Sequence, residues 1–167
     1  MDYQKEIISE YDREIERTRK MLEAIPADVD WNFKPHQKSM SLGRLAGHLV
    51  DFTGDWAIHS LNLDKLEFPA DHKWDPYVTA DKEALLKKFE EKLPEAKAVL
   101  AATTGDRWDQ HWQFIFGGQV WIDQPRHQVF RELVISHMIH HRAQLGLYLR
   151  ILGAKVPGMY GPSADEL

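Results

Sequence analysis

Apolar residues recur every three or four positions in four stretches of the chain, a spacing that places them on one face of a helix. The first stretch covers about residues 3–25 and ends at Pro26. Its apolar stripe consists of Ile8, Tyr11, Ile15, Leu22 and Ile25. Residues 28–40 lack this periodicity and predict a loop, whose expected anchors are Trp31, Phe33 and Pro35.

The second stretch runs from about Ser41 to Leu61, and Ser39 or Ser41 is a suitable N-cap. Its inward stripe consists of Leu42, Leu45, Leu49, Phe52, Trp56 and His59. The connection that follows, residues 62–77, is longer than two antiparallel neighbours need. It therefore predicts a crossover that returns the chain to the end where this helix began.

The third stretch covers about residues 80–102, with Thr79 as its expected cap and Pro94 in its middle. Because a proline removes one backbone hydrogen bond, we expect a kink near Glu90 and Glu91. The residues expected to face inward are Leu85, Leu86, Phe89, Leu93, Ala96, Val99 and Leu100.

Two β-rich runs within residues 112–122 flank Gly117 and Gly118, the composition of a two-residue hairpin turn. A lone hairpin is marginally stable, so we expect it to lie across the end of a bundle. The fourth helix begins near Pro125 and ends before Gly153. The whole pattern predicts an all-α, single-domain four-helix bundle over residues 1–167, with a long crossover between helices two and three and a small β-hairpin before helix four.

Charge and composition narrow the classes of function. The net charge is −5 over 167 residues, and no run of Lys or Arg offers a basic face, so we expect no nucleic-acid partner. Residues 1–6 lack the order of a signal peptide, and no apolar run approaches the roughly 20 residues that span a bilayer. We therefore expect a cytoplasmic protein that does not enter membranes.

The candidate chemistry lies in the fourth helix, where His137 and His141 are four positions apart. On a helix both imidazoles project from one face and can reach a single metal ion, and His48 offers a third ring. The chain has no cysteine, so a metal must be bound by His, Asp or Glu, and any thiol must come from a substrate.

A simpler interpretation competes with metal binding. The chain has nine His, so one pair at this spacing can arise by chance on a solvated or hydrogen-bonded helix. The pair falls in line with an inward stripe, however, and buried rings without a partner would be costly. That stripe consists of Phe130, Leu133, Val134, Leu145, Tyr148 and Ile151.

Several neighbouring side chains have two interpretations each. Asp51, three residues after His48, either orients that ring or accepts a proton near the metal, or it faces solvent. Gln144 either hydrogen-bonds a metal-bound water or is a buried amide satisfied by backbone. His140 points about 100° away from His141 and is assigned to the surface or an interface. Arg142 is expected in a structural salt bridge. The aromatic residues expected in the core, some of which can wall a pocket near the hairpin, are Trp56, Trp112, Phe116 and Trp121.

The sequence resembles the DinB/YfiT-like superfamily of metal-binding bundle proteins along essentially its whole length. The resemblance rests on Gly47-His48-Leu49, on His137 to Gln144, and on the ending from Leu152 to Glu166. It implies a bundle with a crossover, often dimeric, and a divalent ion, zinc or nickel, held at His48, His137 and His141. Members commonly carry Gly between the Arg and the Gln, where this chain has Ala143.

Two classes of function follow. Members of known activity move or isomerise thiol-bearing small molecules, so the resemblance implies a metal-dependent transferase, and an open metal site also suits a hydrolase. The expected partners are a small-molecule substrate and a second copy of the chain. The alternative is a non-catalytic bundle that binds a metal or ligand. A three-His site favours the enzyme, because a structural ion usually has its fourth position filled by protein.

Overall fold

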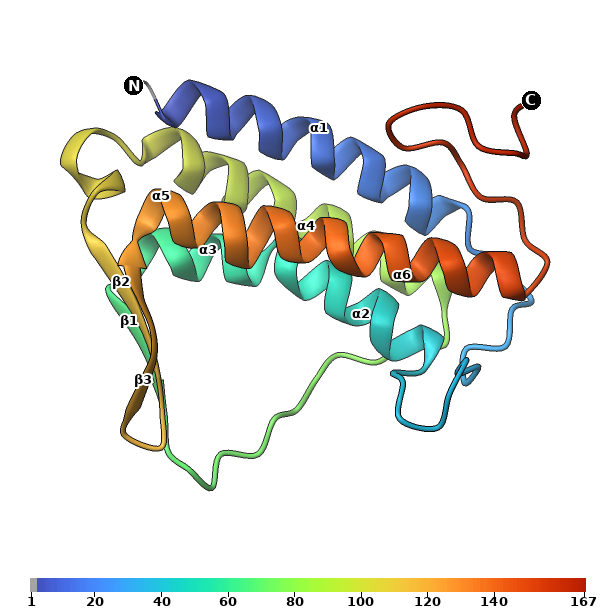
Figure 1. Ribbon diagram of the computed structural model, residues 1–167, viewed down its shortest axis with the longest axis horizontal. Helices are drawn as coiled ribbons and strands as arrows, with labels where there is room; N and C mark the ends of the chain where they lie inside the picture. Colours follow the sequence, from blue (N-terminus) through green and yellow to red (C-terminus); the bar gives the residue numbers. More distant parts are fainter. Residues whose placement is uncertain (1–2) are drawn as a thin grey trace.

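Four helical segments form most of the molecule, and a small sheet stands at one end of them (Figure 1). The computed structural model describes residues 3–167. The first segment is α1 (Tyr3–Glu23), and the second consists of α2 (Leu42–Thr53) and α3 (Asp55–Asn62). The third is α4 (Lys82–Ala102). The fourth consists of α5 (Arg126–Val129), a π-helical stretch (Phe130–Ser136) and α6 (His137–Ile151).

The apolar stripes of these segments meet in one core, with α2 packed against both α4 and α6, and α1 against the other face of the same two helices. Most positions expected to face inward are buried, and several are half-buried. Two are exposed. His59 is exposed because the break at Gly54 changes the phase of the helix, so that Ala57, Ile58 and Leu61 face the core instead.

Ile151 is the second position wrongly expected in the core, since 54% of its surface is exposed. Leu145 and Leu149 define the buried face at this end of α6. Ile151 lies two residues beyond Leu149, about 200° around the helix. Of the loop anchors, Trp31 is buried and Phe33 half-buried, whereas Pro35 is exposed.

The helix starts are fixed by capping side chains. Ser41 is the N-cap of α2, as expected, and its hydroxyl accepts a hydrogen bond from the backbone N–H of Arg44 at 3.3 Å. The expectation of Thr79 as the cap of α4 is wrong. Asp81 caps that helix, accepting bonds from two backbone N–H groups, because α4 begins two residues later than the sequence predicted. The helix continues through Pro94.

The sheet contains the predicted hairpin and one strand that the sequence did not reveal. Strands β2 (His111–Phe116) and β3 (Gln119–Pro125) are antiparallel, and Gly117 and Gly118 make the turn with φ of +58° and +75°. Strand β1 (Lys65–Phe68) joins the other edge of β2 in parallel. Between α4 and β2 lies a single 3₁₀ turn, Gly105–Trp108.

The long connection after α3 forms β1 and then runs back beneath the helices to the start of α4 (Figure 1). Its last part lies directly against α2, because Gly43 and Gly47 carry no side chain there. A Cβ at either position would collide with a backbone carbonyl oxygen, that of Thr79 or of Tyr77. The two glycines, one turn apart, thus hold this segment beside His48.

The irregular tail after Gly153 returns along α1, and Tyr160 from this tail meets the predicted ion pair of Arg142. The Arg142 guanidinium binds the Glu14 carboxylate, donates to the Glu14 backbone oxygen at 3.0 Å, and donates to the Tyr160 hydroxyl at 2.7 Å. The structural salt bridge expected for Arg142 is therefore confirmed. None of the helices within residues 3–167 is long and apolar enough to cross a membrane.

Candidate metal centre

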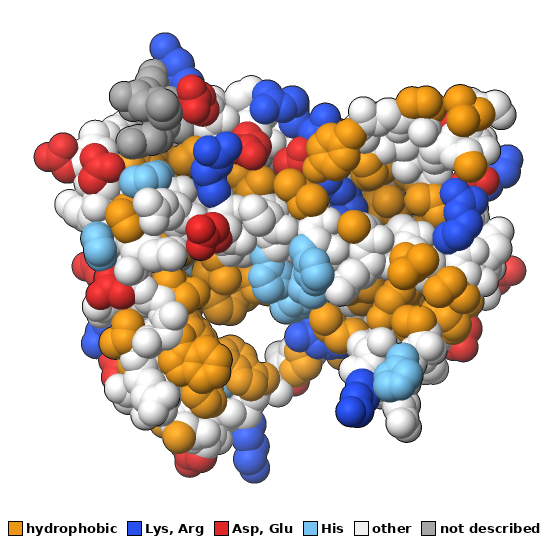
Figure 2. All heavy atoms as spheres, in the orientation of Figure 1, with side chains coloured by type: hydrophobic (Ala, Val, Ile, Leu, Met, Phe, Trp, Pro, Cys, Tyr) orange, Lys and Arg blue, Asp and Glu red, His pale blue; other side chains and the backbone are white. Residues whose placement is uncertain are grey.

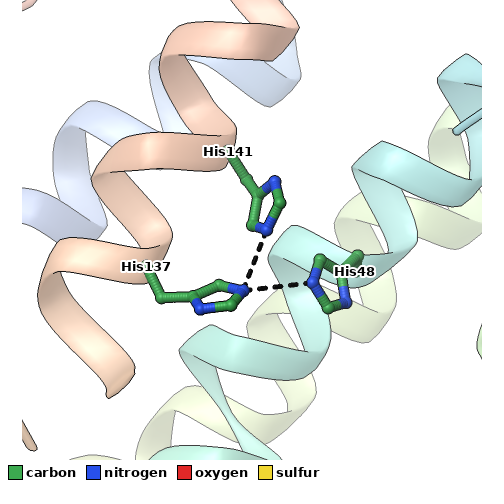
Figure 3. A group of neighbouring side chains, drawn as sticks. All are labelled: His48, His137 and His141. Atoms are coloured by element: carbon green, nitrogen blue, oxygen red, sulfur yellow. Dashed lines mark hydrogen bonds between the residues drawn. The ribbon is translucent and has the colours of Figure 1, made fainter. Parts of the chain in front are cut away.

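His48, His137 and His141 converge on one point between α2 and α6 (Figure 3). The Nε2 atom of His137 lies 3.2 Å from Nε2 of His48 and 2.8 Å from Nε2 of His141. The potential ligand atoms of all three residues lie within 4.8 Å of one another. The sequence prediction that these three side chains would meet agrees with the structure.

The π-helical stretch before α6 sets the direction in which His137 and His141 project. His137 is the first residue of α6 and directly follows the π-helical stretch. Its backbone N–H is bonded to the carbonyls of Glu132 and Val134. Extra residues inserted into a helix as π turns are frequent at functional sites, because they re-aim the side chains that follow. The periodicity of the sequence did not reveal this stretch.

The two distances at Nε2 of His137 are close to those between ligands of a shared divalent ion. Ligands about 2.0–2.1 Å from a metal at tetrahedral or octahedral angles are roughly 2.9–3.4 Å apart. The contacts that His137 makes are less well explained by hydrogen bonding alone. Its Nε2 faces two other ring nitrogens, and a single nitrogen of a neutral imidazole either donates or accepts. Three lone pairs directed at one cation satisfy all three rings.

The surroundings keep these rings uncharged. Burial lowers the pKa of His48 to about 3 and that of His137 to about 4, and proximity of the rings to one another adds to the shift. Burial also lowers the pKa of His141. Metal ligation requires neutral imidazole, so at neutral pH all three rings are in the form that binds a metal.

Gln144 orients one of the rings. Its Oε1 lies 2.8 Å from Nδ1 of His141, and its Nε2 lies 3.0 Å from Nε2 of His140. The amide thus accepts the Nδ1 proton of His141 and donates to His140, leaving the Nε2 lone pair of His141 free. His140 is exposed, as expected. The predicted bond from Gln144 to a metal-bound water stays a prediction.

Asp51 lines the cavity beside this centre, and its carboxylate lies 3.8 Å from Nζ of Lys88. Burial raises the pKa of the Asp51 carboxyl, although the positive charges of Lys88 and Arg44 counteract the shift. Its part as a proton acceptor stays a prediction.

A cavity of about 850 Å³ adjoins the centre through His48. Helices α2 and α3 form its roof, the sheet one wall, and residues 74–78 of the long connection another. Figure 2 shows it as a hollow with a group of His side chains at its edge and hydrophobic side chains around it. The ring of Phe52 stacks on that of His137 at 3.8 Å, and Trp56 stacks on Phe52 at 5.0 Å.

The aromatic wall differs in part from the one the sequence suggested. Trp56 lines the cavity, whereas Trp112 is fully buried and 66% of the Trp121 surface is exposed. Sequence reasoning missed the other aromatic members of the wall, which are Phe68, Trp74, Tyr77 and Phe114. The sequence pattern could have indicated only Phe114, because it lies in the predicted hairpin. The other three belong to residues 62–77, which were predicted to be a connection without a further role.

Comparisons with known proteins agree with this architecture. A model described as the DinB family matches residues 1–167. An uncharacterized protein, YrdA, of Bacillus subtilis (strain 168) is 26% identical over 162 residues, which cover 95% of this chain and 89% of that protein. Two crystal structures share the fold at 21% identity. A DinB-like protein from Bacillus cereus ATCC 10987 superimposes with a TM-score of 0.69 over 92% of this chain and 95% of the other. The DinB-like protein YjoA of Bacillus subtilis superimposes with a TM-score of 0.65 over 95% of this chain and 99% of the other.

Proposed function

This chain belongs to the DinB family, and from that premise we propose that it is a divalent-metal-dependent enzyme acting on a small molecule held in the cavity beside His48. The zinc or nickel ion would be held by His48, His137 and His141. We include in the proposal the family's four-helix arrangement with its crossover, which places α2 and α6 side by side around these ligands.

The observation that carries the proposal is the union of a three-His group with a cavity. Three protein ligands leave coordination positions open, and open positions are typical of catalytic rather than structural sites. His48 belongs both to the group and to the cavity wall, so a molecule in the cavity would lie next to the ion. A structural ion would need no such access.

The ion would supply a thiolate or hydroxide nucleophile at neutral pH by lowering the pKa of a bound thiol or water. The protein's own residues have separate tasks. Gln144 holds His141 in the tautomer that presents Nε2. Phe52 covers one face of the His137 ring, and Trp56 in turn stacks on Phe52. Asp51 on the cavity wall is the proposed proton acceptor.

Two reaction types remain within the proposal, transfer of a thiol-bearing molecule and hydrolysis. The absence of cysteine from the chain means that a thiol would come from the substrate. We place the enzyme in the cytoplasm, as a homodimer. Large apolar side chains on the outer face of α6 support the dimer, since Leu147 is 58% and Ile151 54% exposed.

The test is a screen of thiol-transfer and hydrolytic reactions with the metal-loaded protein, the chelated protein and the variant His141→Ala. We expect turnover only in the loaded wild type. His36→Ala, in the exposed connection between α1 and α2, is the matched control and should retain activity. A large loss of thermal stability on chelation, without metal-dependent turnover in any reaction, would instead favour the non-catalytic, metal-binding alternative.

A further inference from the structure

Arg44 lies one helical turn before His48 on α2 and lines the same cavity. Its side chain is half-buried, and its Nη1 atom is buried without a hydrogen-bond partner. No acidic side chain within residues 3–167 forms an ion pair with this guanidinium. Ser41 caps α2 by accepting a hydrogen bond from the backbone N–H of Arg44, so the guanidinium of Arg44 has no part in the cap.

The other charged groups near the helical roof of the cavity already have partners. Asp51 lies 3.8 Å from Nζ of Lys88, and Asp55 lies 3.0 Å from Nζ of Lys92. The Lys88 ammonium also lies 3.8 Å from the centre of the Tyr77 ring. The one further acid of the lining, Asp75, is exposed in the long connection. Among the described residues, Arg44 therefore makes no ion pair beside the three imidazoles, and the charge of Asp51 acts on it only from beyond ion-pair distance.

An unpartnered guanidinium nitrogen in a buried position is costly, because it loses its hydrogen bonds to water. Burial accordingly lowers the pKa of Arg44 from its usual value. In proteins a buried guanidinium nitrogen normally donates a hydrogen bond to an acceptor, which here a ligand could supply. The positive charge also reaches the metal centre, since it helps to lower the pKa values of His48 and His141. A negative ligand at Arg44 would thus lie near the proposed reaction site.

We propose that Arg44 binds the carboxylate of the substrate, and that the apolar part of the substrate lies against the aromatic wall of the cavity. The inference rests on the proposed function in taking this cavity as the substrate site. A planar guanidinium matches one carboxylate through two parallel hydrogen bonds. A phosphate dianion fits less well, because Asp51 and Asp55 share the cavity and a second unpaired cation is lacking in its described lining.

The aromatic residues that line the same cavity as Arg44 give the second half of the selectivity. Phe68 contacts Trp74 with ring centres 4.8 Å apart, and Phe114 lies 6.1 Å from Trp56 and 6.0 Å from Phe68. Trp74 is 52% exposed, so a ligand can cover it. The geometry selects a monocarboxylate with a flat or apolar body over a purely polar acid.

The test uses the metal-stripped protein and two probes of equal shape, 3-phenylpropionate and its neutral amide, 3-phenylpropanamide. Tryptophan fluorescence reports binding, because Trp56 and Trp74 line the cavity. We expect the wild type to bind the acid about tenfold or more tightly than the amide, as is typical of a charge-assisted pair. Arg44→Gln should bind both probes equally, and Arg44→Lys should retain part of the preference.

Lys87→Gln is the matched control, since it removes one positive charge from the exposed face of α4 outside the cavity lining. It should keep the full preference for the acid. The inference is overturned by a wild type that binds the two probes equally or binds neither, or by an Arg44→Gln variant that still prefers the acid. If Arg44→Gln does not fold, Arg44→Lys decides, because an undiminished preference there would exclude a guanidinium-specific site.

Failure of this inference is distinguishable from failure of the proposed function. The probe measurement needs no metal, whereas the proposed function is tested by metal-dependent turnover. Thermal unfolding gives a further readout: because the buried Nη1 has no partner, Arg44→Gln should leave the melting temperature unchanged or raise it. A clear fall in melting temperature would assign Arg44 a structural role and count against the inference.

Discussion

Gln144 accepts a hydrogen bond from His141, with Oε1 of the amide 2.8 Å from Nδ1 of the ring. This bond decides which nitrogen of His141 carries its proton and leaves Nε2, the atom facing His137, as a lone-pair donor. The amide therefore orients one ring of the proposed metal centre without itself being a ligand.

Replacing Gln144 by Ala should weaken metal binding by about 10- to 100-fold, the usual effect of removing a partner behind a ligating imidazole. Gln144→Glu should bind the metal at least as tightly as the wild type, because a carboxylate accepts the same proton more strongly. Metal titration against a competing chelator measures both variants. Gln128→Ala, an exposed amide in α5, is the control. Unchanged affinity in Gln144→Ala would show that the observed bond does not orient the ligand.

Metal retention should depend on pH, over a range set by the pKa values of the buried His ligands. Free imidazoles near pKa 6.5 would lose metal just below neutral pH. The buried rings of His48 and His137, with pKa values of about 3 and 4, should resist protonation further into the acid range. We expect occupancy to persist at pH 6 and to fall as the pH approaches 4. Occupancy independent of pH down to 3 would point to carboxylate ligands.

The same depressed pKa values make the metal-free protein sensitive to acid. Between pH 6.5 and about 4, these rings bind protons in the unfolded chain but not in the folded one. The free energy of unfolding should therefore be largest above pH 6.5 and should decrease as the pH falls toward 4. Urea titrations of the chelated wild type and of His48→Gln across this range measure the effect. A pH slope in His48→Gln as steep as in the wild type would contradict the assignment.

Arg142 should be a major stabilising residue, because its guanidinium and the Glu14 carboxylate are only 2% and 6% exposed. Arg142→Met removes the buried cation of this pair and leaves Glu14 with Arg17 alone. The loss should approach, without exceeding, the about 3–5 kcal/mol typical of a broken buried pair. Denaturant unfolding of this variant measures the loss. Arg131→Met, which removes a cation paired with Glu10 at the exposed surface, should cost less than about 1 kcal/mol. Equal losses in the two variants would refute the expected importance of burial.

The outer face of α6 is the proposed dimer contact. Leu147→Glu combined with Ile151→Glu should convert a homodimer into a monomer, because two charges would be buried against the partner. Sedimentation measures the change. Val120→Glu, at an exposed site in the hairpin, is the control and should leave the dimer intact. A wild type that is monomeric at all practical concentrations would remove the basis of this prediction.

Much of the metal centre could be predicted from the sequence, because helical spacing alone brings His137 and His141 to one face. The hairpin at Gly117–Gly118 was equally accessible, since that turn requires positive φ at both positions. These features depend on short-range geometry. His48 was placed correctly through its position beside an apolar stripe, together with the family resemblance.

The cavity could not be predicted, because it depends on long-range packing. Strand β1 is short, and its pairing with β2 spans nearly 50 residues of intervening chain. The break at Gly54 and the π-helical stretch before His137 each change which side chains face the core. No Pro stands at either place to indicate an interruption of the helix. The helical periodicity gives no reason to assign Arg44 to a cavity. That assignment depends on Tyr77 and the sheet, which line the same cavity.

X-ray absorption at the edge of the bound metal tests the central claim most directly. We predict about three imidazoles at about 2.0–2.2 Å, together with a light-atom ligand that exchanges for sulfur when a small thiol is added. His141→Ala should lose one imidazole or the metal itself. A protein that takes up no divalent ion, or a spectrum without imidazole scattering, would contradict the assignment of His48, His137 and His141 as an open metal site.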